Sequence, residues 1–488
     1  MAHKDLREFI KVLEAEGELL RIKEVVDWNV ELGAVSRRMC DKETKGSPAP
    51  ALMFENIKGH PGYTFFTNTL ASLRRYALAL GLNKDTPVKE MIRTFHERIK
   101  KPIKPKIVKD GPCKENIFRG DNVDLLKFPT PKWHPKDGHR YIGTFHAVIQ
   151  KDLDTDWVNW GLYRMGIHDK NSTGILIIKG QHSSEIFRKY QDANKPMPMA
   201  VAIGQDPINV IVSAAGFPAG TSEVDMAGGL RGEPVEIVKA ETCDLYVPTT
   251  AEIVLEGEVI PGELKMEGPF GEYTGYYGGD VFPKPIFHVK CVTYRNNPIL
   301  TGSLEGVPLV DDHIMASVSH SALARWNLID VLGVPGVQDV YFYPSAASWS
   351  MAIVSAKRLV AGLPQQIAFG IWASKFGSSS GSACWVIVVE EDVDPTDINQ
   401  VIWSMTTRCD PKDRVQIIRD RGWCTALLPR IPRAGRVDFT KSASSIIIDA
   451  GFPFEWRTAD PDSIPSVANW ENWPESVRKR AREILHEK

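Results

Sequence analysis

The chain has 488 residues, of which 43% are hydrophobic and 25% are charged, and its formal net charge is −2. This length exceeds a single ordinary hydrophobic core, so two or three domains are expected. The charges form no long run of one sign, which argues against nucleic acid or a membrane surface as the main partner. Met1–Asp5 leads into no apolar signal-peptide core, and no apolar run approaches the ~20 residues of a membrane span.

Seven cysteines are scattered along the chain, and none forms a C-x-x-C pair. An odd number of separate thiols suits a reducing cytoplasm better than a disulfide framework, so a cytoplasmic protein is predicted. The Gly/Ser-rich stretch 377–382 lacks a lysine and a following helix, which favours a flexible loop over a phosphate-binding loop. No dinucleotide fingerprint, P-loop or G-x-S-x-G elbow occurs, so the chemistry must come from other motifs.

The first 112 residues predict a small α/β domain. Gly17 is expected to end the first helix, and Asn29 is expected to cap the second. The proline-containing stretch 101–109 predicts the first domain boundary. In chain order, the expected elements are a helix over 5–16, a strand over 19–26, a helix over about 29–39, strands over 51–57 and 63–67, and helices over about 72–82 and 87–99.

Residues 113–305 carry mostly strand patterns separated by turn signals, which predicts a barrel or a sandwich. A lone helix is expected over 183–194 within this domain. The expected strands are 141–150, 157–165, 174–179, 199–204, 252–260, 285–294 and 298–304.

Alternating helices and strands return over residues 306–470 and predict a third, α/β domain. The apolar centre of 444–449 is typical of a buried parallel strand. A charged helix over about 474–486, within a final segment 471–488, is expected to contact another subunit. The other expected elements are a helix over 313–331, strands over 336–343 and 385–391, and a helix over 395–407 that follows Asp394.

The hexapeptide Glu267-Gly-Pro-Phe-Gly-Glu272 is the most informative motif, because it places two carboxylates five residues apart around glycine and proline. Only a tight turn brings both side chains to one site, and Gly268, Pro269 and Gly271 permit one. Paired carboxylates in one pocket push their pKa values apart, so that one acts as an acid while the other stays charged. The alternative is a surface loop with two solvated acids.

Asn159 and Arg164 lie on one predicted strand, where alternation puts them on opposite faces. A bulge at Gly161 would bring them to one site. A buried Arg164 needs a carboxylate partner, for which Glu267 is the natural candidate. The alternative is an exposed arginine on an edge strand.

His182 follows a predicted strand, and Glu223 follows a Gly/Pro-rich loop. A lone histidine is more often a structural hydrogen-bonding residue, and Glu223 after Ser222 fits the first turn of a helix. The functional alternative is a site for Mg²⁺ or Mn²⁺, since asparagine, histidine and glutamate are ligands that suit these ions better than zinc.

Taken together in order and spacing, these motifs resemble the UbiD family of decarboxylases. The resemblance covers nearly the whole chain. It rests on Asn159-Trp160-x-x-x-Arg164, Gln181-His182, Thr221-Ser222-Glu223, the stretch 242–256, Glu267–Glu272 and the following Tyr273-Thr-Gly-Tyr-Tyr. The family binds prenylated FMN and interconverts unsaturated or aromatic acids with CO₂ and the decarboxylated product. For the fold, the resemblance implies an N-terminal α/β unit (1–112), a central split β-barrel that binds the flavin (113–305), and a C-terminal α/β domain (306–470) with a terminal oligomerisation helix.

The resemblance also implies the residues of the site. Arg164, Glu267 and Glu272 match the family's catalytic Glu-Arg-Glu triad. A divalent cation, Mn²⁺ or Mg²⁺, would bind Asn159, His182 and Glu223. K⁺ would bind Glu223 and backbone carbonyls around Ala214, Ala215 and Phe217. The cofactor itself would contact Asn159, Gly161, Leu162, Arg164, Gln181, His182, Ala215, Phe217, Pro218 and Glu223.

The implied reaction is reversible non-oxidative decarboxylation through a covalent prenylated-FMN adduct. Arg164 would bind the substrate carboxylate, and Glu272 would donate the proton. Tyr273–Tyr277 resembles the arene-carboxylate branch, which favours an aromatic or heteroaromatic acid. Glu305, His313 and Leu427–Leu428 align with pocket residues. At one position the chain departs from the family, because Cys384 stands where relatives carry a lysine that reaches the cofactor.

Three alternatives stay open at this point. The chain could be a split-barrel FMN-dependent reductase, a decarboxylase of an α,β-unsaturated (acrylic) acid, or a flavin-binding protein without catalytic activity. The expected partners are a small aromatic acid, a flavin prenyltransferase that supplies the cofactor, and copies of the same chain in a homodimer or a hexamer of three dimers. The physiological direction of the reaction is not specified by the sequence.

Overall fold

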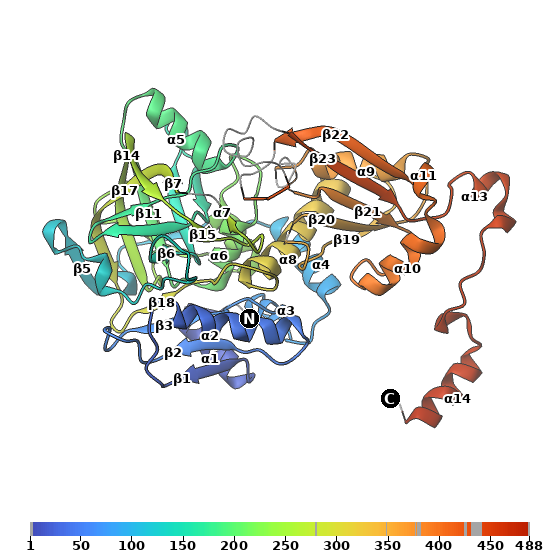
Figure 1. Ribbon diagram of the computed structural model, residues 1–488, viewed down its shortest axis with the longest axis horizontal. Coiled ribbons are helices and arrows are strands. Elements are labelled where there is room, and N and C mark those ends of the chain that lie inside the picture. Colours follow the sequence, from blue (N-terminus) through green and yellow to red (C-terminus); the bar gives the residue numbers. More distant parts are fainter. Residues whose placement is uncertain are drawn as a thin grey trace.

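The computed structural model describes residues 3–278, 281–347, 349–375, 377, 382–423, 427–430 and 442–486. Three parts, each built around a sheet, follow one another along the chain, and a C-terminal segment runs away from the main body (Figure 1). This is the mixed α/β multidomain fold that the sequence predicts. The domain limits at 112, 305 and 470 stay predictions.

The N-terminal sheet has four strands in the order β1-β2-β3-β18. β1 (Leu19–Ile22) and β2 (Ala51–Phe54) are parallel, and β3 (Thr64–Thr67) is antiparallel to β2. β18 (Ile299–Thr301) returns from the end of the central part and pairs in parallel with β3. The two parts therefore share a sheet, and one hydrophobic core runs through both.

The N-terminal helices confirm the amphipathic patterns. In α1 (Leu6–Ala15) the apolar side chains at the predicted spacing are buried. The predicted cap of α2 (Glu31–Thr44) is wrong, because the N-cap residue is Val30, which has a left-handed φ of 64° and makes no side-chain capping hydrogen bond. The remaining helices are α3 (Leu73–Ala79) and α4 (Val88–Ile99).

The central part is a curled, half-barrel sheet of nine strands with antiparallel neighbours, as expected for a barrel-type domain (Figure 1). Its order is β6-β9-β10-β17-β14-β11-β7-β8, with β5 paired to β17. The strands are β5 (Asn116–Arg119), β6 (Tyr141–Gly143), β7 (His146–Lys151), β8 (Val158–Gly161), β9 (Met165–Asp169), β10 (Ser172–Gly174), β11 (Met197–Ile203), β14 (Ile253–Glu267) and β17 (Phe282–Tyr294).

Two predictions in the central part are wrong. The strand over 174–179 ends at Gly174, and the chain then crosses to α5 (His182–Asp192). That helix is also not alone, since α6 (Pro207–Ala214) and α7 (Glu223–Arg231) follow it. α6 is buried on all sides, its polar residues Asn209 and Ser213 included, so its sequence shows no clear amphipathic period.

Small sheets complete this part. β4 (Lys106–Val108), β12 (Glu236–Lys239) and β13 (Tyr246–Pro248) form one, and β15 (Phe270–Gly271) pairs with β16 (Tyr277–Gly278) in another. The second pairing closes a hairpin turn that begins at Glu272, five residues after Glu267 at the end of β14.

The C-terminal sheet has the order β19-β20-β21-β23-β22, with a parallel centre and antiparallel edges. The buried parallel strand predicted around 444–449 is confirmed as part of β23, and α10 is capped by Asp397 rather than by Asp394. β20, α9 and β22 were not predicted. The strands are β19 (Val337–Phe342), β20 (Met351–Ala356), β21 (Trp385–Val389), β22 (Val415–Trp423) and β23 (Ser442–Asp449), and the helices are α8 (Asp311–Trp326), α9 (Leu363–Trp372), α10 (Ile398–Arg408) and α11 (Pro411–Arg414).

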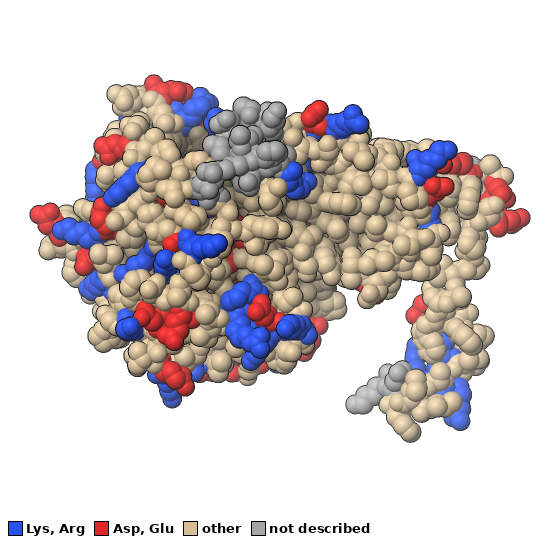
Figure 2. Space-filling view, viewed as in Figure 1, with Lys and Arg blue, Asp and Glu red and all other residues tan. Residues whose placement is uncertain are grey.

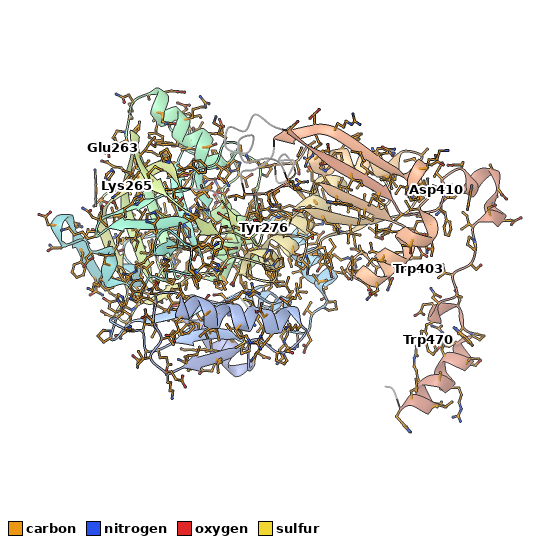
Figure 3. The ribbon with its side chains drawn as sticks, viewed as in Figure 1. Glu263, Lys265, Tyr276, Trp403, Asp410 and Trp470 are labelled. Carbon is orange, nitrogen blue, oxygen red and sulfur yellow. The ribbon has the colours of Figure 1, made fainter. Side chains whose placement is uncertain are left out.

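Helix α8 joins the three parts, because it packs on α4, α6 and β19. The final segment, with α13 (Trp456–Ala459) and α14 (Glu475–Leu485), extends away from this body, and the Trp470 side chain lies on it (Figure 3). Charges of both signs are interspersed on the face in Figure 2. No helix in the described part of the chain has both the length and the hydropathy that a membrane span requires.

Candidate active site

Arg164, Glu267 and Glu272 come together although they lie in different elements. Arg164 lies in the irregular link between β8 and β9, Glu267 ends β14, and Glu272 follows β15. The Arg164 Nε donates to Glu267 Oε1 at 3.1 Å and Nη2 donates to Glu267 Oε2 at 2.8 Å. Nη1 contacts Glu272 Oε1 on the other side. One guanidinium thus lies between two carboxylates, all three side chains being buried.

The backbone of the hexapeptide explains why both glutamates face inwards. Gly268 has a φ of 95°, which favours glycine, and its carbonyl lies where a Cβ on Gly138 would be. Asp137 accepts the Gly271 N–H at 3.0 Å, and the Glu272 N–H donates to Tyr276 O at 2.9 Å. The alternatives of a solvated acidic loop and an exposed arginine are therefore wrong.

The surroundings of the two carboxyl groups shift their pKa values in opposite directions. Burial raises the pKa of Glu272 to about 7, against the lowering effect of Arg164 and with a further rise from Glu267. Burial acts in the same direction on Glu267, but the charge and hydrogen bonds of Arg164 and the Tyr141 hydroxyl hold its pKa below the ordinary value. At neutral pH Glu267 is therefore ionised, while Glu272 is partly protonated.

A cavity with a volume of about 270 Å³ opens beside this cluster. Of the side chains predicted for the cofactor and the pocket, Leu162, Arg164, Gln181, Glu272, Glu305 and Leu427 line it, and Ala214 does so too. His313 does not, because its ring is buried with Nε2 2.7 Å from Tyr273 O, and Leu428 is also outside the lining. The cavity is therefore bounded by the catalytic cluster on one side and by the Gly180–Gln181 corner on another.

A second cluster contains Asn159, His182 and Glu223. Asn159 lies on β8, His182 begins α5 and Glu223 begins α7, as expected for a helix after Ser222. His182 Nδ1 lies 3.1 Å from Asn159 Oδ1, and Glu223 Oε2 accepts the Trp160 N–H at 3.0 Å. Burial and, to a smaller extent, the charge of Lys375 together lower the pKa of His182 to about 4, whereas burial raises that of Glu223 to about 8.

This second cluster fits a divalent cation. His182 Nε2 is buried and has no hydrogen-bond partner among the described residues. The Asn159 amide oxygen contacts the His182 imidazole, and the Glu223 carboxylate binds the backbone N–H of Trp160, the residue after Asn159. Amide oxygen, imidazole and carboxylate are a donor set that suits Mn²⁺ or Mg²⁺. Within the described ranges, no group of three or more His, Cys, Asp or Glu side chains is arranged to hold a metal ion, so any ion at this cluster would use the Asn159 amide as a ligand.

The remaining positions expected around the cofactor lie near this cluster but outside the cavity lining. They are Gly161, Ala215, Phe217 and Pro218. A Cβ on Gly161 would meet the Tyr163 ring at 2.3 Å, so the glycine has a packing reason of its own. β8 ends at Gly161, and the irregular link that follows lets Asn159 and Arg164 serve neighbouring sites.

Sequence reasoning missed part of the cavity wall. Lys375 lines the cavity, and its Nζ donates to Gly180 O, while burial lowers its pKa. Cys384 is buried with Sγ 3.2 Å from Ser350 O and is not part of the lining. No motif marked Lys375, because it follows α9 in an irregular segment. The other unanticipated wall residues include Thr144, Tyr273, Asp312, His320 and Trp349.

Models of the three domains of 3-octaprenyl-4-hydroxybenzoate carboxy-lyase match residues 10–95 (N-terminal domain), 106–308 (Rift-related domain) and 313–450 (C-terminal domain). The pyrrole-2-carboxylic acid decarboxylase of Pseudomonas aeruginosa is 33% identical to this chain, and the alignment covers 83% of this chain and 83% of that protein. A phenolic acid decarboxylase of Bacillus subtilis is 35% identical over 95% of this chain and 96% of that protein.

Solved structures agree with these relatives. The closed form of the vanillic acid decarboxylase of Sedimentibacter hydroxybenzoicus is 30% identical and superposes with a TM-score of 0.87 over 100% of this chain and 99% of that chain. The UbiD-class enzyme HmfF of Pelotomaculum thermopropionicum, in complex with prFMN, is 26% identical with a TM-score of 0.77 over 97% and 99%. The chain belongs to the UbiD family, which confirms the resemblance, and it is a carboxy-lyase.

Proposed function

We propose that this enzyme reversibly decarboxylates an aromatic or heteroaromatic carboxylic acid with prenylated FMN as its cofactor. The observation that carries this proposal is a buried guanidinium between an ionised and a protonatable glutamate at the wall of a cavity. The relatives named above act on pyrrole-2-carboxylic, phenolic and vanillic acids, which supports an arene or heteroarene over an acrylic acid.

The protein needs a cofactor because no side chain accepts the electron pair that CO₂ leaves behind, and prenylated FMN supplies that electron sink when bound. Leu162 and Gln181 line the cavity where the flavin ring would lie. Asn159, His182 and Glu223 would hold Mn²⁺ or Mg²⁺, and the carbonyls at Ala214, Ala215 and Phe217 would hold K⁺, next to the cofactor phosphate. Lys375 adds a positive charge on the cavity wall, close enough to His182 to lower its pKa. The cofactor would come from a separate flavin prenyltransferase.

Arg164 binds and orients the substrate carboxylate. Glu267 already holds two of its nitrogens, so the guanidinium is fixed before the substrate arrives. Protonated Glu272 then delivers one proton to the carbon that loses CO₂, and the carboxylate that remains accepts a proton in the reverse direction.

The raised pKa values of the acids in the cavity wall reduce their repulsion of an anionic substrate. Arg164 and ionised Glu267 cancel, so repulsion depends on the other acids. Burial raises the pKa of Glu305 well above its usual range, with further rises from Asp312 and Glu272, and burial together with Asp311 raises that of Asp312 to about 7. Neutral acids at these positions avoid repelling a carboxylate substrate, whereas three ionised ones would do so strongly.

The test is to incubate cofactor-loaded enzyme in deuterated buffer with matched aryl, heteroaryl and acrylic acids. We expect CO₂ release and deuterium at the former carboxyl carbon for aryl or heteroaryl acids, read by mass spectrometry. Turnover of acrylic acids alone would favour the alternative substrate class. Oxidation of reduced nicotinamide without CO₂ release from any acid would favour the reductase.

The C-terminal segment supports assembly with further copies of the chain. Trp470 and Trp473 are 41% and 56% exposed on a segment that projects from the body (Figure 3). Large apolar side chains on a projecting arm favour a partner surface. A homodimer, or a hexamer of three dimers, is the assembly we propose, and sedimentation of the full chain and of a chain ending at residue 460 tests it.

A further inference from the structure

Tyr141 lies behind the catalytic cluster and had no role in the sequence motifs. It begins β6, its side chain is 1% exposed, and its ring packs on Phe270 with the centroids 4.4 Å apart. The same Phe270 ring lies 5.0 Å from the Arg164 guanidinium. Tyr141 is therefore fixed by its own packing against β15 (Phe270–Gly271), which lies between the two glutamates in the chain.

The Tyr141 hydroxyl has one hydrogen and two acceptors within reach. Glu267 Oε1 lies at 2.9 Å and Pro269 O at 3.2 Å. A hydrogen bond to a carboxylate is stronger than one to a neutral carbonyl, so the hydrogen is donated to Glu267 when that residue is ionised. The hydroxyl then complements the two Arg164 bonds to the same carboxylate.

The two glutamates are thereby made unequal. Glu267 accepts from the Arg164 Nε, the Arg164 Nη2 and the Tyr141 hydroxyl, whereas the Glu272 side chain contacts only Nη1 among the described donors. Donors stabilise the charged form of a carboxyl group, so the proton is kept on the residue with fewer of them. The asymmetry decides which glutamate holds Arg164 and which one carries the transferable proton.

We propose that Tyr141 is a positioning residue that keeps Glu267 as the carboxylate holding Arg164, an inference that rests on the proposed function of this cluster. Other charged groups also act on Glu267 and remain when the hydroxyl is removed. Arg164 and Glu272 face it in the cluster, and the rest are His139 and Asp137 before β6, His168 on β9 with Lys265 on β14 beside it, and Lys284 on β17. A partial effect is therefore expected, not complete loss of the cluster.

The test compares Tyr141→Phe with Tyr294→Phe. Both remove only a hydroxyl, but Tyr294 lies at the opposite end of the β14–β17 hairpin, where it accepts a hydrogen bond from Lys127 Nζ at 2.6 Å. Loss of a donor raises the pKa of Glu267, so the acid limb of the kcat/KM profile of Tyr141→Phe moves up by about one pH unit. The alkaline limb, which belongs to Glu272, stays in place, and at neutral pH KM rises about threefold to tenfold with a smaller change in kcat. Tyr294→Phe keeps the wild-type profile.

A second readout needs neither cofactor nor turnover. An infrared titration of the cofactor-free full chain, with bands assigned by their loss in Glu267→Gln and Glu272→Gln, follows each carboxyl group separately. We expect protonation of Glu267 at a pH about one unit higher in Tyr141→Phe, and an unmoved Glu272. Uniform scaling of the rate profile at every pH, or an unmoved Glu267 band, would overturn the inference. A shifted band in an enzyme that decarboxylates no acid would instead support Tyr141 positioning and sink the proposed function.

Discussion

Both clusters of this site bring together side chains that are far apart in the sequence, but they differ in whether their buried charged and polar groups pair with one another. Arg164, Glu267 and Glu272 satisfy one another, with one guanidinium between two acids. Asn159, His182 and Glu223 do not satisfy one another in this way. His182 Nε2 is buried without a hydrogen-bond partner among the described residues, and the buried Glu223 carboxylate accepts a hydrogen bond from the neutral Trp160 N–H instead of pairing with a cation. The first cluster is organised by the protein's own charges, whereas the second contains the side chains that we propose as ligands of a cation.

This difference predicts that the first cluster affects the rate of the reaction and that the second affects the affinity for the cofactor. In the cluster of Arg164, Glu267 and Glu272, one carboxyl group can be changed without disturbing binding at the cluster of Asn159, His182 and Glu223. Under the proposed function, the second cluster would set cofactor affinity, because a cation bound there would balance the negative charge of the cofactor phosphate and of Glu223. Each variant below should therefore change one property and spare the other.

The largest effect is expected from Glu272→Gln. The amide keeps the size of the side chain and its contact with Arg164 but cannot deliver the proton, so kcat should fall by about 10³-fold or more. Flavin affinity, measured by fluorescence titration, should stay within about twofold of wild type. An equal loss of flavin binding would show that the two clusters are not separable.

Removal of the divalent metal should have the opposite pattern. A phosphate brings roughly two negative charges, and without an ion the proposed ligands Asn159, His182 and Glu223 supply no positive charge to balance them. We expect chelator treatment, or His182→Ala, to weaken FMN binding by about 100-fold, with metal content followed by elemental analysis. Undiminished FMN affinity in metal-free protein would contradict this assignment.

Lys375→Met is expected to weaken only the binding of the cofactor phosphate. Its cation lies on the cavity wall next to Gly180, so FMN affinity should fall about tenfold while riboflavin, which lacks the phosphate, binds unchanged. Lys375→Arg should retain most of the affinity. Cys384→Lys in the Lys375→Met background tests whether the position used by relatives can restore it. Equal losses for both flavins would mean that Lys375 only supports the wall.

The smallest expected change is in pH dependence. In the proposed reaction Glu272 acts in its protonated form, and burial raises its pKa to about 7. The rate of decarboxylation should therefore be highest below pH 7 and fall towards tenfold per unit well above it, in a pH–kcat profile measured with saturating substrate. A rate that rises with pH through this range would exclude Glu272 as the proton donor in decarboxylation.

Residues close in sequence were predicted well. The apolar spacing of α1 and the apolar run in β23 are local patterns, and the structure has both. The paired glutamates were recognised because glycine and proline constrain that turn whatever surrounds it. By contrast, α6 was missed because burial on all sides removes the period on which the prediction depends.

The motifs also identified the family, together with the three side chains that meet in the catalytic cluster, because residue types at fixed spacing survive without knowledge of the fold. Only the tertiary structure decided that β18 closes the N-terminal sheet, that Lys375 reaches the cavity, and that Tyr141 contacts Glu267. These are contacts between distant segments, and the environment that raises the pKa of Glu272 is made of such contacts. A linear pattern carries the identity of a charged group, but its protonation state depends on burial and on neighbours that the folded chain brings to it.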